Sequence, residues 1–241
     1  MRFDVYEYTN HGGRDYNEDA VGHKVIGDNG VFLVADGLGG HNFGEVASAC
    51  VRDTLVNGFG GDFGGNPAGW LEAVVNKANE NILAIQKEKN DVLKSTVVAL
   101  CIENGRAVWG NVGDSRLYYI HNGDIAAYTN DHSVAYKKFK AGEITRDQLR
   151  SDEDQSALLR SLGSDDRHEV ELYDNGITVV SGDAFMLCSD GVWEFVKDYE
   201  VLIDLLKAHN AKEWAELLLL RMMERIQGGN DNLTIQTIMI N

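Results

Sequence analysis

Acidic residues stand where apolar segments of this chain begin or end. The segment VFLVADGLGGH, at residues 31–41, runs from apolar residues into a carboxylate, and VWGNVGDSR and FMLCSDG repeat the pattern. Two more segments, RDYNEDAVG and GGNDNLTIQTIMI, place acids just before an apolar run. The acids at these positions are Glu18, Asp19, Asp36, Asp114, Asp190 and Asp231. Carboxylates at the ends of buried strands predict a site for a hard cation.

The alternative for each acid is an ordinary turn. Asp-Gly is a common turn dipeptide, and its Asp can accept hydrogen bonds from backbone N–H groups. One such pair needs no other explanation, but the recurrence of the pattern in separate segments favours a shared site. If the strand ends converge, their negative charges cannot all persist without compensation. The absence of His and Cys at these positions argues against zinc.

The glycines after Asp36 do not match a known phosphate loop. A P-loop requires Lys-Ser/Thr after its last glycine, and none follows Gly40. Gly37, Gly39 and Gly40 also lack the G-x-G-x-x-G spacing of a dinucleotide site. The loop is therefore not predicted to bind a nucleotide through its amides.

The composition indicates a globular, acidic protein. Its 241 residues are 44% apolar, and no apolar stretch reaches the roughly 18 residues of a membrane span. The N-terminus, MRFDVYEYTN, is acidic and alternating, unlike a signal peptide, so we expect a cytoplasmic protein. The net charge of −16 opposes nucleic acid as a partner. Cys50, Cys101 and Cys188 form no close pair, which predicts free, buried thiols.

Hydrophobic periodicity predicts an α+β protein. Strands are expected at 2–8, 20–26, 31–35, 95–102, 106–112, 116–121, 124–128, 169–173, 177–180, 184–188 and 232–240. Helices are expected at 43–57, 67–88, 131–140, 145–150, 198–207 and 211–227. Asn-Gly pairs at 104–105, 122–123 and 175–176 predict tight hairpins and antiparallel sheet. We expect a single domain over residues 1–241, with two packed sheets and helices outside.

The ordered motifs resemble those of one enzyme family. RDYNEDA, VADGLGGH, STVVAL, VGDSRLY, NDHSV, LCSDGVWEFV and GGNDNLT together resemble the PPM family of metal-dependent serine/threonine protein phosphatases, above all its compact bacterial members. The resemblance spans residues 9–238. It implies a four-layer α-β-β-α sandwich with a binuclear centre of Mg²⁺ or Mn²⁺ at one end of the sheets.

The resemblance also implies how the metal ions are held. Asp36 would bridge both ions. The Gly37 carbonyl and Glu18 would bind one ion, and Asp190 and Asp231 would bind the other.

Other residues complete the implied site. Asp19 would hold waters of the metal centre, and Arg14 would grip two oxygens of the substrate phosphate. The alternative for Arg14 is a salt bridge to nearby acids. Asp114 would share a third, weaker ion with Asp190. Its alternative is a turn cap within a surface hydrogen-bond cluster that includes residues 115–116.

One position departs from many family members. Leu38 stands two residues after the bridging aspartate, where many eukaryotic members carry histidine and the bacterial branch carries an apolar residue. His41 is expected to make local hydrogen bonds. The implied nucleophile is a metal-activated water, so Ser115, Ser189 and Cys188 are not expected to be nucleophiles.

The charged segment 134–160 corresponds to the flap beside the site in bacterial members. It is either a solvated helical excursion or a surface that selects protein substrates. We therefore predict a monomeric enzyme that hydrolyses phosphoserine and phosphothreonine in phosphorylated proteins and opposes a serine/threonine kinase in bacterial signalling. The alternatives are a non-catalytic phosphoprotein-binding regulator of the same fold, a small-molecule phosphatase or a metal-dependent nuclease.

Overall fold

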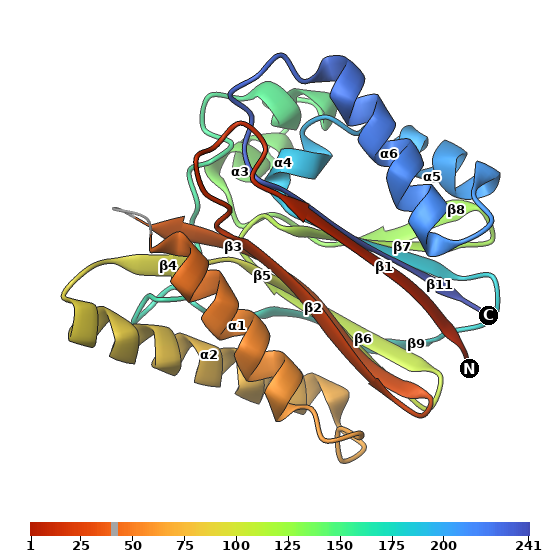
Figure 1. Ribbon diagram of the computed structural model, residues 1–241, viewed down its shortest axis with the longest axis horizontal. Coiled ribbons are helices and arrows are strands. Elements are labelled where there is room, and N and C mark those ends of the chain that lie inside the picture. The colour runs from red at the N-terminus through yellow and green to blue at the C-terminus, as the bar shows by residue number, and fades with distance from the viewer. Residues whose placement is uncertain (40–42) are drawn as a thin grey trace.

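Two antiparallel β-sheets pack face to face, and helices cover both outer faces (Figure 1). The computed structural model describes residues 1–39 and 43–241. The prediction made for His41 lies outside these ranges. The arrangement of two sheets between helical layers confirms the expected α+β sandwich.

The first sheet joins the two ends of the chain. Its strands, in spatial order, are β1 (Phe3–Asn10), β11 (Leu233–Ile240), β10 (Ala184–Cys188), β7 (Arg116–His121) and β8 (Asp124–Tyr128). Phe3 pairs with Ile240 at one end of β1, and Asn10 pairs with Leu233 at the other. The segment that follows β1 therefore lies beside the segment that precedes β11.

The second sheet carries the longest strand. Its strands, in spatial order, are β2 (Asp19–Ile26), β3 (Asn29–Gly39), β5 (Val97–Glu103), β6 (Arg106–Val112) and β9 (Glu171–Thr178). A short strand, β4 (Leu93–Ser95), pairs with the last residues of β3. This pairing extends the hydrogen-bonded part of β3 beyond Val34, where its pairing with β5 ends.

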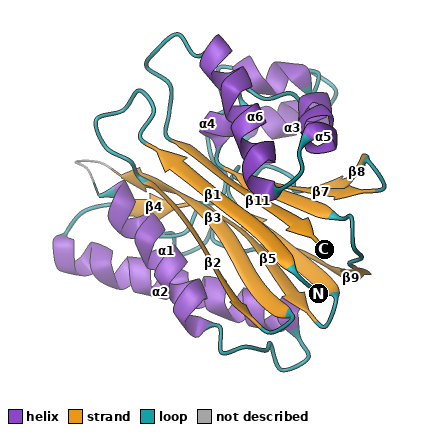
Figure 2. Cartoon of the chain, turned by 45° about the vertical axis from the view of Figure 1, so that its right-hand side comes forward, coloured by secondary structure: helices purple, strands orange, loops and turns teal. Residues whose placement is uncertain are grey.

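Helices form the outer layers, as Figure 2 shows from a second direction. α1 (Gly44–Gly58) and α2 (Pro67–Lys89) cover the second sheet, and α5 (Asp198–Lys207) and α6 (Ala211–Arg225) cover the first. The shorter elements are α3 (Val134–Lys140), the 3₁₀ helix η1 (Asp147–Ser151) and α4 (Asp190–Trp193). Asn66 and Asn210 cap the starts of α2 and α6, where their side chains accept from the Gly69 and Glu213 N–H groups at 3.1 and 2.8 Å. Within the described ranges, no helix combines the length and apolar character that crossing a bilayer requires.

Strand β3 is buried on both faces. Val31, Leu33 and Ala35 belong to the core beneath α1 and α2. Phe32 and Val34 point the other way, into the core between the two sheets. Because both faces are covered, the strand is continuously apolar instead of alternating. The unbroken apolar run before the acid at its end therefore follows from its central position in the fold.

The prediction of a hairpin at 175–176 is wrong. β9 runs without a break from Glu171 to Thr178. A two-residue hairpin turn of this kind needs positive φ at both central residues, as found at 104–105 and 122–123, whereas only Gly176 of the third pair has it. The pairing of β9 with β6 shifts register between Ala107 and Trp109, so the glycine lies in a β-bulge.

One helix boundary differs from expectation, and one short helix is additional. The helix predicted at 131–140 begins only at Val134, because the Ser133 side chain accepts from the Tyr136 N–H and caps it. The short helix α4, directly after β10, was not expected. Both differences concern segments near the strand-end acids.

Candidate metal and phosphate site

Asp36 lies at the end of the buried part of β3, beside Asp19 of β2. The two residues are direct partners in the pairing of these strands. The Thr96 N–H donates to the Asp36 carbonyl at 2.8 Å, and the Thr96 hydroxyl accepts from the Asp36 N–H at 3.0 Å. The Ser95 hydroxyl donates to the same carbonyl at 3.0 Å. With its backbone held in this way, Asp36 presents its carboxylate from a fixed position.

A serine joins the acids of the second sheet to those of the first. Asp190 directly follows Ser189 after β10, and Asp231 lies two residues before the start of β11. The Ser189 hydroxyl donates to Asp19 Oδ2 at 2.7 Å and accepts from the Thr234 N–H at 3.2 Å. The strand ends that carry these acids therefore meet at one end of the sandwich.

The acids lie close enough for their charges to affect one another. Burial raises the pKa of Asp36 and Asp190 well above the usual range, and the charges of neighbouring acids raise both further. Burial also raises the pKa of Asp19 to about 6 and that of Asp114 to about 7. Asp231 adds to the repulsion at Asp19, Asp36 and Asp190. The structure therefore brings together the acids that the strand-end pattern selected.

These carboxylates repel one another and are not arranged as a preformed set of metal ligands. Among the described residues, no group of three or more His, Cys, Asp or Glu side chains stands in a metal-binding arrangement. A divalent cation would supply the charge that such a cluster lacks. The donors are all oxygen atoms, which suits Mg²⁺ or Mn²⁺ better than Zn²⁺.

Glu18 and the Gly37 carbonyl border one small space at the start of α1. A Cβ atom at Gly44 would lie 2.6 Å from the Glu18 carboxylate and 2.7 Å from the Gly37 oxygen. The Gly44 N–H donates to Glu18 Oε1 at 3.0 Å. The Glu18 N–H donates to Asn232 Oδ1 at 2.8 Å, which ties this acid to the start of β11. The Glu18 carboxylate and the Gly37 carbonyl therefore lie close together, and both are oxygen donors that a hard cation could bind.

The acids open into a cavity of about 470 Å³. Its lining residues are Arg14, Asp15, Tyr16, Glu18, Asp36, Gly37, Leu38 and Asp231. The structure thus places Leu38 at the cavity, where it is 37% exposed. The Arg14 guanidinium donates to Asp231 Oδ2 at 2.8 Å. Arg14 therefore makes the salt bridge that was given as its alternative role, and it does so at the cavity where it is predicted to bind phosphate.

Asp114 is buried and belongs to the cluster. It raises the pKa of both Asp36 and Asp190 through its charge. The alternative of a surface hydrogen-bond cluster at 115–116 is wrong, because Ser115 and Arg116 are both buried. The Ser115 hydroxyl bonds to that of Thr96 at 2.7 Å, and Arg116 is paired with another acid.

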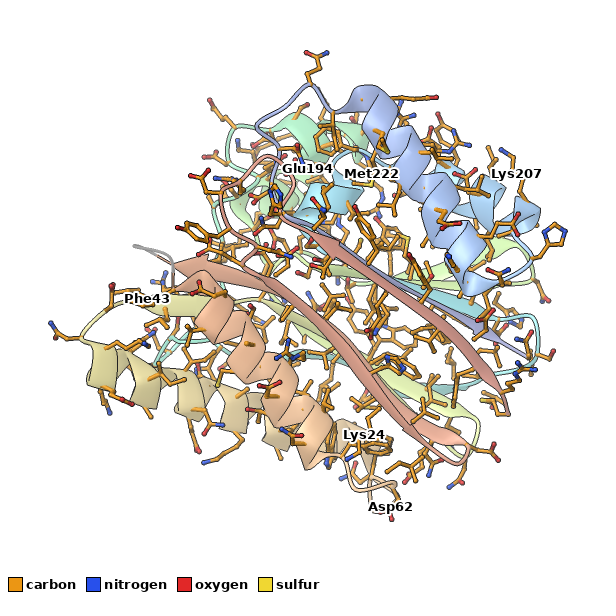
Figure 3. All side chains as sticks on the ribbon, viewed as in Figure 1. Lys24, Phe43, Asp62, Glu194, Lys207 and Met222 are labelled. Atoms are coloured by element: carbon orange, nitrogen blue, oxygen red, sulfur yellow. The ribbon has the colours of Figure 1, made fainter. Side chains whose placement is uncertain are left out.

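Glu194 is a member of the site that strand-end reasoning missed. Burial raises its pKa to about 7, and the charge of Asp231 raises it further. It also adds to the repulsion at Asp114 and Asp190. Its carboxylate accepts from the Gln155 side chain, and Figure 3 shows it beside α4. Its position four residues after Asp190, one helical turn on, is the sequence signal that could have found it.

The side chains that could have acted as nucleophiles are engaged elsewhere. Ser115 and Ser189 make the hydrogen bonds described above. Cys188 is fully buried, and burial raises the pKa of its thiol to about 12. A thiol in that state is unreactive. All three cysteines are free, with Cys101 and Cys188 buried as expected and Cys50 only half-buried.

Comparison with protein families decides the identity of the chain. The family model for protein phosphatase 2C matches residues 10–218, most of the sequence. The chain belongs to the protein phosphatase 2C family. It is a protein serine/threonine phosphatase of the metal-dependent type, as the ordered motifs predicted.

Bacterial members of the protein phosphatase 2C family resemble this chain over nearly all of its own length. It is 29% identical over 229 residues to serine/threonine phosphatase stp of Listeria monocytogenes, which covers 92% of this chain and 89% of the relative. The crystal structure of PstP/Ppp from Mycobacterium tuberculosis matches at 29% identity with a TM-score of 0.86, covering 99% of both chains. The catalytic domain of PstP in complex with two manganese ions matches at 27% identity with a TM-score of 0.84, again covering 99% of both chains.

Proposed function

We propose that this phosphatase works through two Mg²⁺ or Mn²⁺ ions bound at the acid cluster, with a third, weaker ion shared by Asp114 and Asp190. The observation that carries the proposal is the convergence of acids from both sheets beneath Arg14. The two manganese ions in the related PstP domain support the number of ions. The all-oxygen donor set supports their chemical type.

Each ion has its own set of ligands in this proposal. Asp36 would bind both ions from β3, three residues before that strand ends. Glu18 and the Gly37 carbonyl hold one ion, and their closeness around Gly44 supports this assignment. Asp190 and Asp231 hold the other, and the repulsion between them supports it.

The remaining residues prepare the substrate and its surroundings. When bound, the ions activate a water molecule and neutralise charge that develops on the phosphate during in-line displacement. Asp19, held by Ser189, orients water in the site. Arg14 leaves Asp231 and takes two phosphate oxygens, which a planar guanidinium can contact together.

The substrates are phosphorylated proteins, and the relatives support this assignment. The relatives above carry the name serine/threonine phosphatase. A phosphatase of this class needs a serine/threonine kinase to supply its substrates. We therefore infer that the protein reverses such a kinase in a bacterial cell.

The test is turnover of a phosphothreonine peptide with and without added Mn²⁺ or Mg²⁺. We expect activity that EDTA abolishes, and Asp36→Asn should lower it about a thousandfold, because bound metal supplies several kcal/mol. Asp62→Asn is the matched control, since Asp62 lies at the opposite end of the molecule from Glu194 (Figure 3). Full turnover in metal-free buffer would overturn the proposal.

The same assay separates the rival functions. Sugar phosphates and duplex DNA are offered beside the phosphopeptide under identical metal conditions. We expect the phosphopeptide to be hydrolysed far faster than either, and the charge of −16 opposes DNA. Faster hydrolysis of a sugar phosphate would instead identify a small-molecule phosphatase.

A further inference from the structure

The segment NDHSV, residues 130–134, contains a buried histidine that the proposed reaction does not use. His132 is only 7% exposed and lies between β8 and α3. Its neighbour Asp131 pairs with Arg116 through two hydrogen bonds of 2.8 and 2.6 Å. The segment therefore packs against the residues that flank Asp114.

Both ring nitrogens of His132 are engaged. Nδ1 accepts from the Gly113 N–H at 3.1 Å. Nε2 lies 3.1 Å from Glu171 Oε2 and must carry the proton, because Nδ1 is the acceptor. Glu171 also accepts from the Asn130 amide at 2.7 Å and the Tyr173 hydroxyl at 3.1 Å, so it is itself held in place. Burial lowers the pKa of His132, although the hydrogen bond to Glu171 acts in the opposite direction. The lowered pKa agrees with a neutral ring.

The backbone that His132 holds leads directly to Asp114. Gly113 has φ of +100°, and a Cβ atom there would lie 2.6 Å from Thr96 Cγ2. The His132 N–H donates to the Gly113 carbonyl at 2.9 Å, so both backbone groups of this glycine are bound by one residue. On the other side, the Trp193 indole donates to the Asp114 carbonyl at 2.9 Å.

His132 also forms the base of the flap, residues 134–160. Its carbonyl accepts from the Leu159 N–H at 2.7 Å. The next residues continue the contact, since Ser133 bridges to Leu158 and the Val134 N–H donates to Ala157 at 3.0 Å. One residue thus connects the returning end of the flap to the loop that carries Asp114.

We propose that His132 is a positioning residue: its Nδ1 and backbone N–H fix Gly113 so that Asp114 faces the acid cluster, and its carbonyl ties that loop to the flap. Its effect on turnover rests on the proposed function, in which Asp114 holds the third ion. The geometry itself does not depend on that function. The two parts are tested by separate measurements.

The geometric part is tested on the metal-free protein by NMR with ¹⁵N-labelled histidine. We expect His132 as the Nε2–H tautomer and a Gly113 amide that exchanges slowly with solvent. His132→Ala should speed that exchange, whereas His121→Ala should not. His121 is the matched control, because it bonds to buried Asp183 at 2.7 Å from the other end of β7. An Nδ1–H tautomer at His132 would overturn the inference.

The catalytic part is tested by phosphopeptide kinetics at saturating Mn²⁺. His132→Ala should lower kcat about 10- to 100-fold with little change in KM, as is common when a group that orients a metal site is removed. His132→Asn should recover part of kcat, because its side-chain oxygen can still accept from the Gly113 N–H. His121→Ala should behave as the wild type.

A double-mutant cycle with Asp114→Ala decides whether His132 acts through Asp114. If it does, adding His132→Ala to Asp114→Ala should lower kcat by less than twofold, because coupled residues are not additive. Fully additive losses, or wild-type kcat for His132→Ala, would overturn the inference while the wild-type enzyme stays active. Inactivity of the wild type itself would instead contradict the proposed function.

Discussion

Arg14 and Asp231 meet at the mouth of the cavity, where the guanidinium donates to Oδ2 at 2.8 Å. Their side chains are 57% and 38% exposed. An ion pair in such an exposed place contributes only about 0–1 kcal/mol. Phosphate can therefore displace Asp231 from Arg14 at small cost, and the pairing holds the arginine over the acids until substrate arrives.

Loss of Arg14 should weaken the binding of substrate more than that of metal. We expect Arg14→Ala to lower kcat/KM for a phosphopeptide about 10- to 100-fold, because a charged, bidentate phosphate contact is lost. Arg14→Lys should recover only part, since lysine cannot bind two oxygens in the same way. Steady-state kinetics and calorimetric Mn²⁺ titration measure the two effects.

The control for Arg14 is Arg52→Ala on α1. Arg52 also makes a partly exposed ion pair, with Asp53 at 2.8 Å, but it does not line the cavity. We expect wild-type kinetics from it. Wild-type kinetics from Arg14→Ala would show that Arg14 does not bind the substrate phosphate.

A methyl group at position 44 should weaken the binding of one of the two metal ions. In Gly44→Ala the new Cβ would lie 2.6 Å from the Glu18 carboxylate and 2.7 Å from the Gly37 oxygen. We expect the affinity for one Mn²⁺ ion to fall by about 10-fold or more, because two of its oxygen ligands are pushed aside. Calorimetry should show one tight site and one weakened site.

Gly58→Ala supplies the matched control at the other end of α1. Its Cβ would meet Val74 at 3.4 Å, an ordinary contact, so metal binding should not change. If Gly44→Ala also left both sites intact, Glu18 and the Gly37 carbonyl would not be ligands of one ion.

A buried ion-pair group between α5 and α6 should make stability depend on acidic pH. Glu200 is 2% exposed and accepts from Arg225 at 2.7 Å and from Arg221 at 3.3 Å. The Arg225 hydrogen bonds lower the pKa of Glu200 from 4.5 to about 2. Because the folded-state value is the lower one, the stabilisation is full above pH 4.5 and is lost as pH falls toward 2.

Glu200→Gln measures that contribution. Chemical denaturation at pH 7 should show a loss of about 2 kcal/mol, typical for hydrogen bonds to charged groups. The difference from the wild type should shrink as the pH falls from 5 to 3. Glu216→Gln is the control, since Glu216 is exposed and pairs with Lys212 only at 3.6 Å. A difference that stays constant with pH would show that the charge of Glu200 contributes nothing.

Local chemistry predicted most elements of the fold, because each element carries its own signal. The Asn66 and Asn210 caps and the Asn104-Gly105 and Asn122-Gly123 turns all depend on adjacent residues. The Asn175-Gly176 pair misled the prediction because its conformation is set by pairing with β6. Tertiary contact decided that position, and no local pattern reports such contact.

The acids of the site were predictable, but the residues that hold them were not. Asp36 and Asp190 could be selected because each follows an apolar run in the sequence. Ser189, His132 and Asn232 act through contacts with segments distant in the chain, such as the bond between Asn232 and the Glu18 N–H. Their types are common in any turn, so only the three-dimensional arrangement shows what they do.

The most direct test of the metal assignment is anomalous diffraction at the manganese edge from crystals grown with Mn²⁺. We expect two strong peaks, one on either side of the Asp36 carboxylate. One should lie beside Glu18 and the Gly37 oxygen, the other beside Asp190 and Asp231, with any third peak weaker. Protein that dephosphorylates a phosphopeptide in Mn²⁺ yet shows no manganese peak next to Asp36 would contradict the metal assignment.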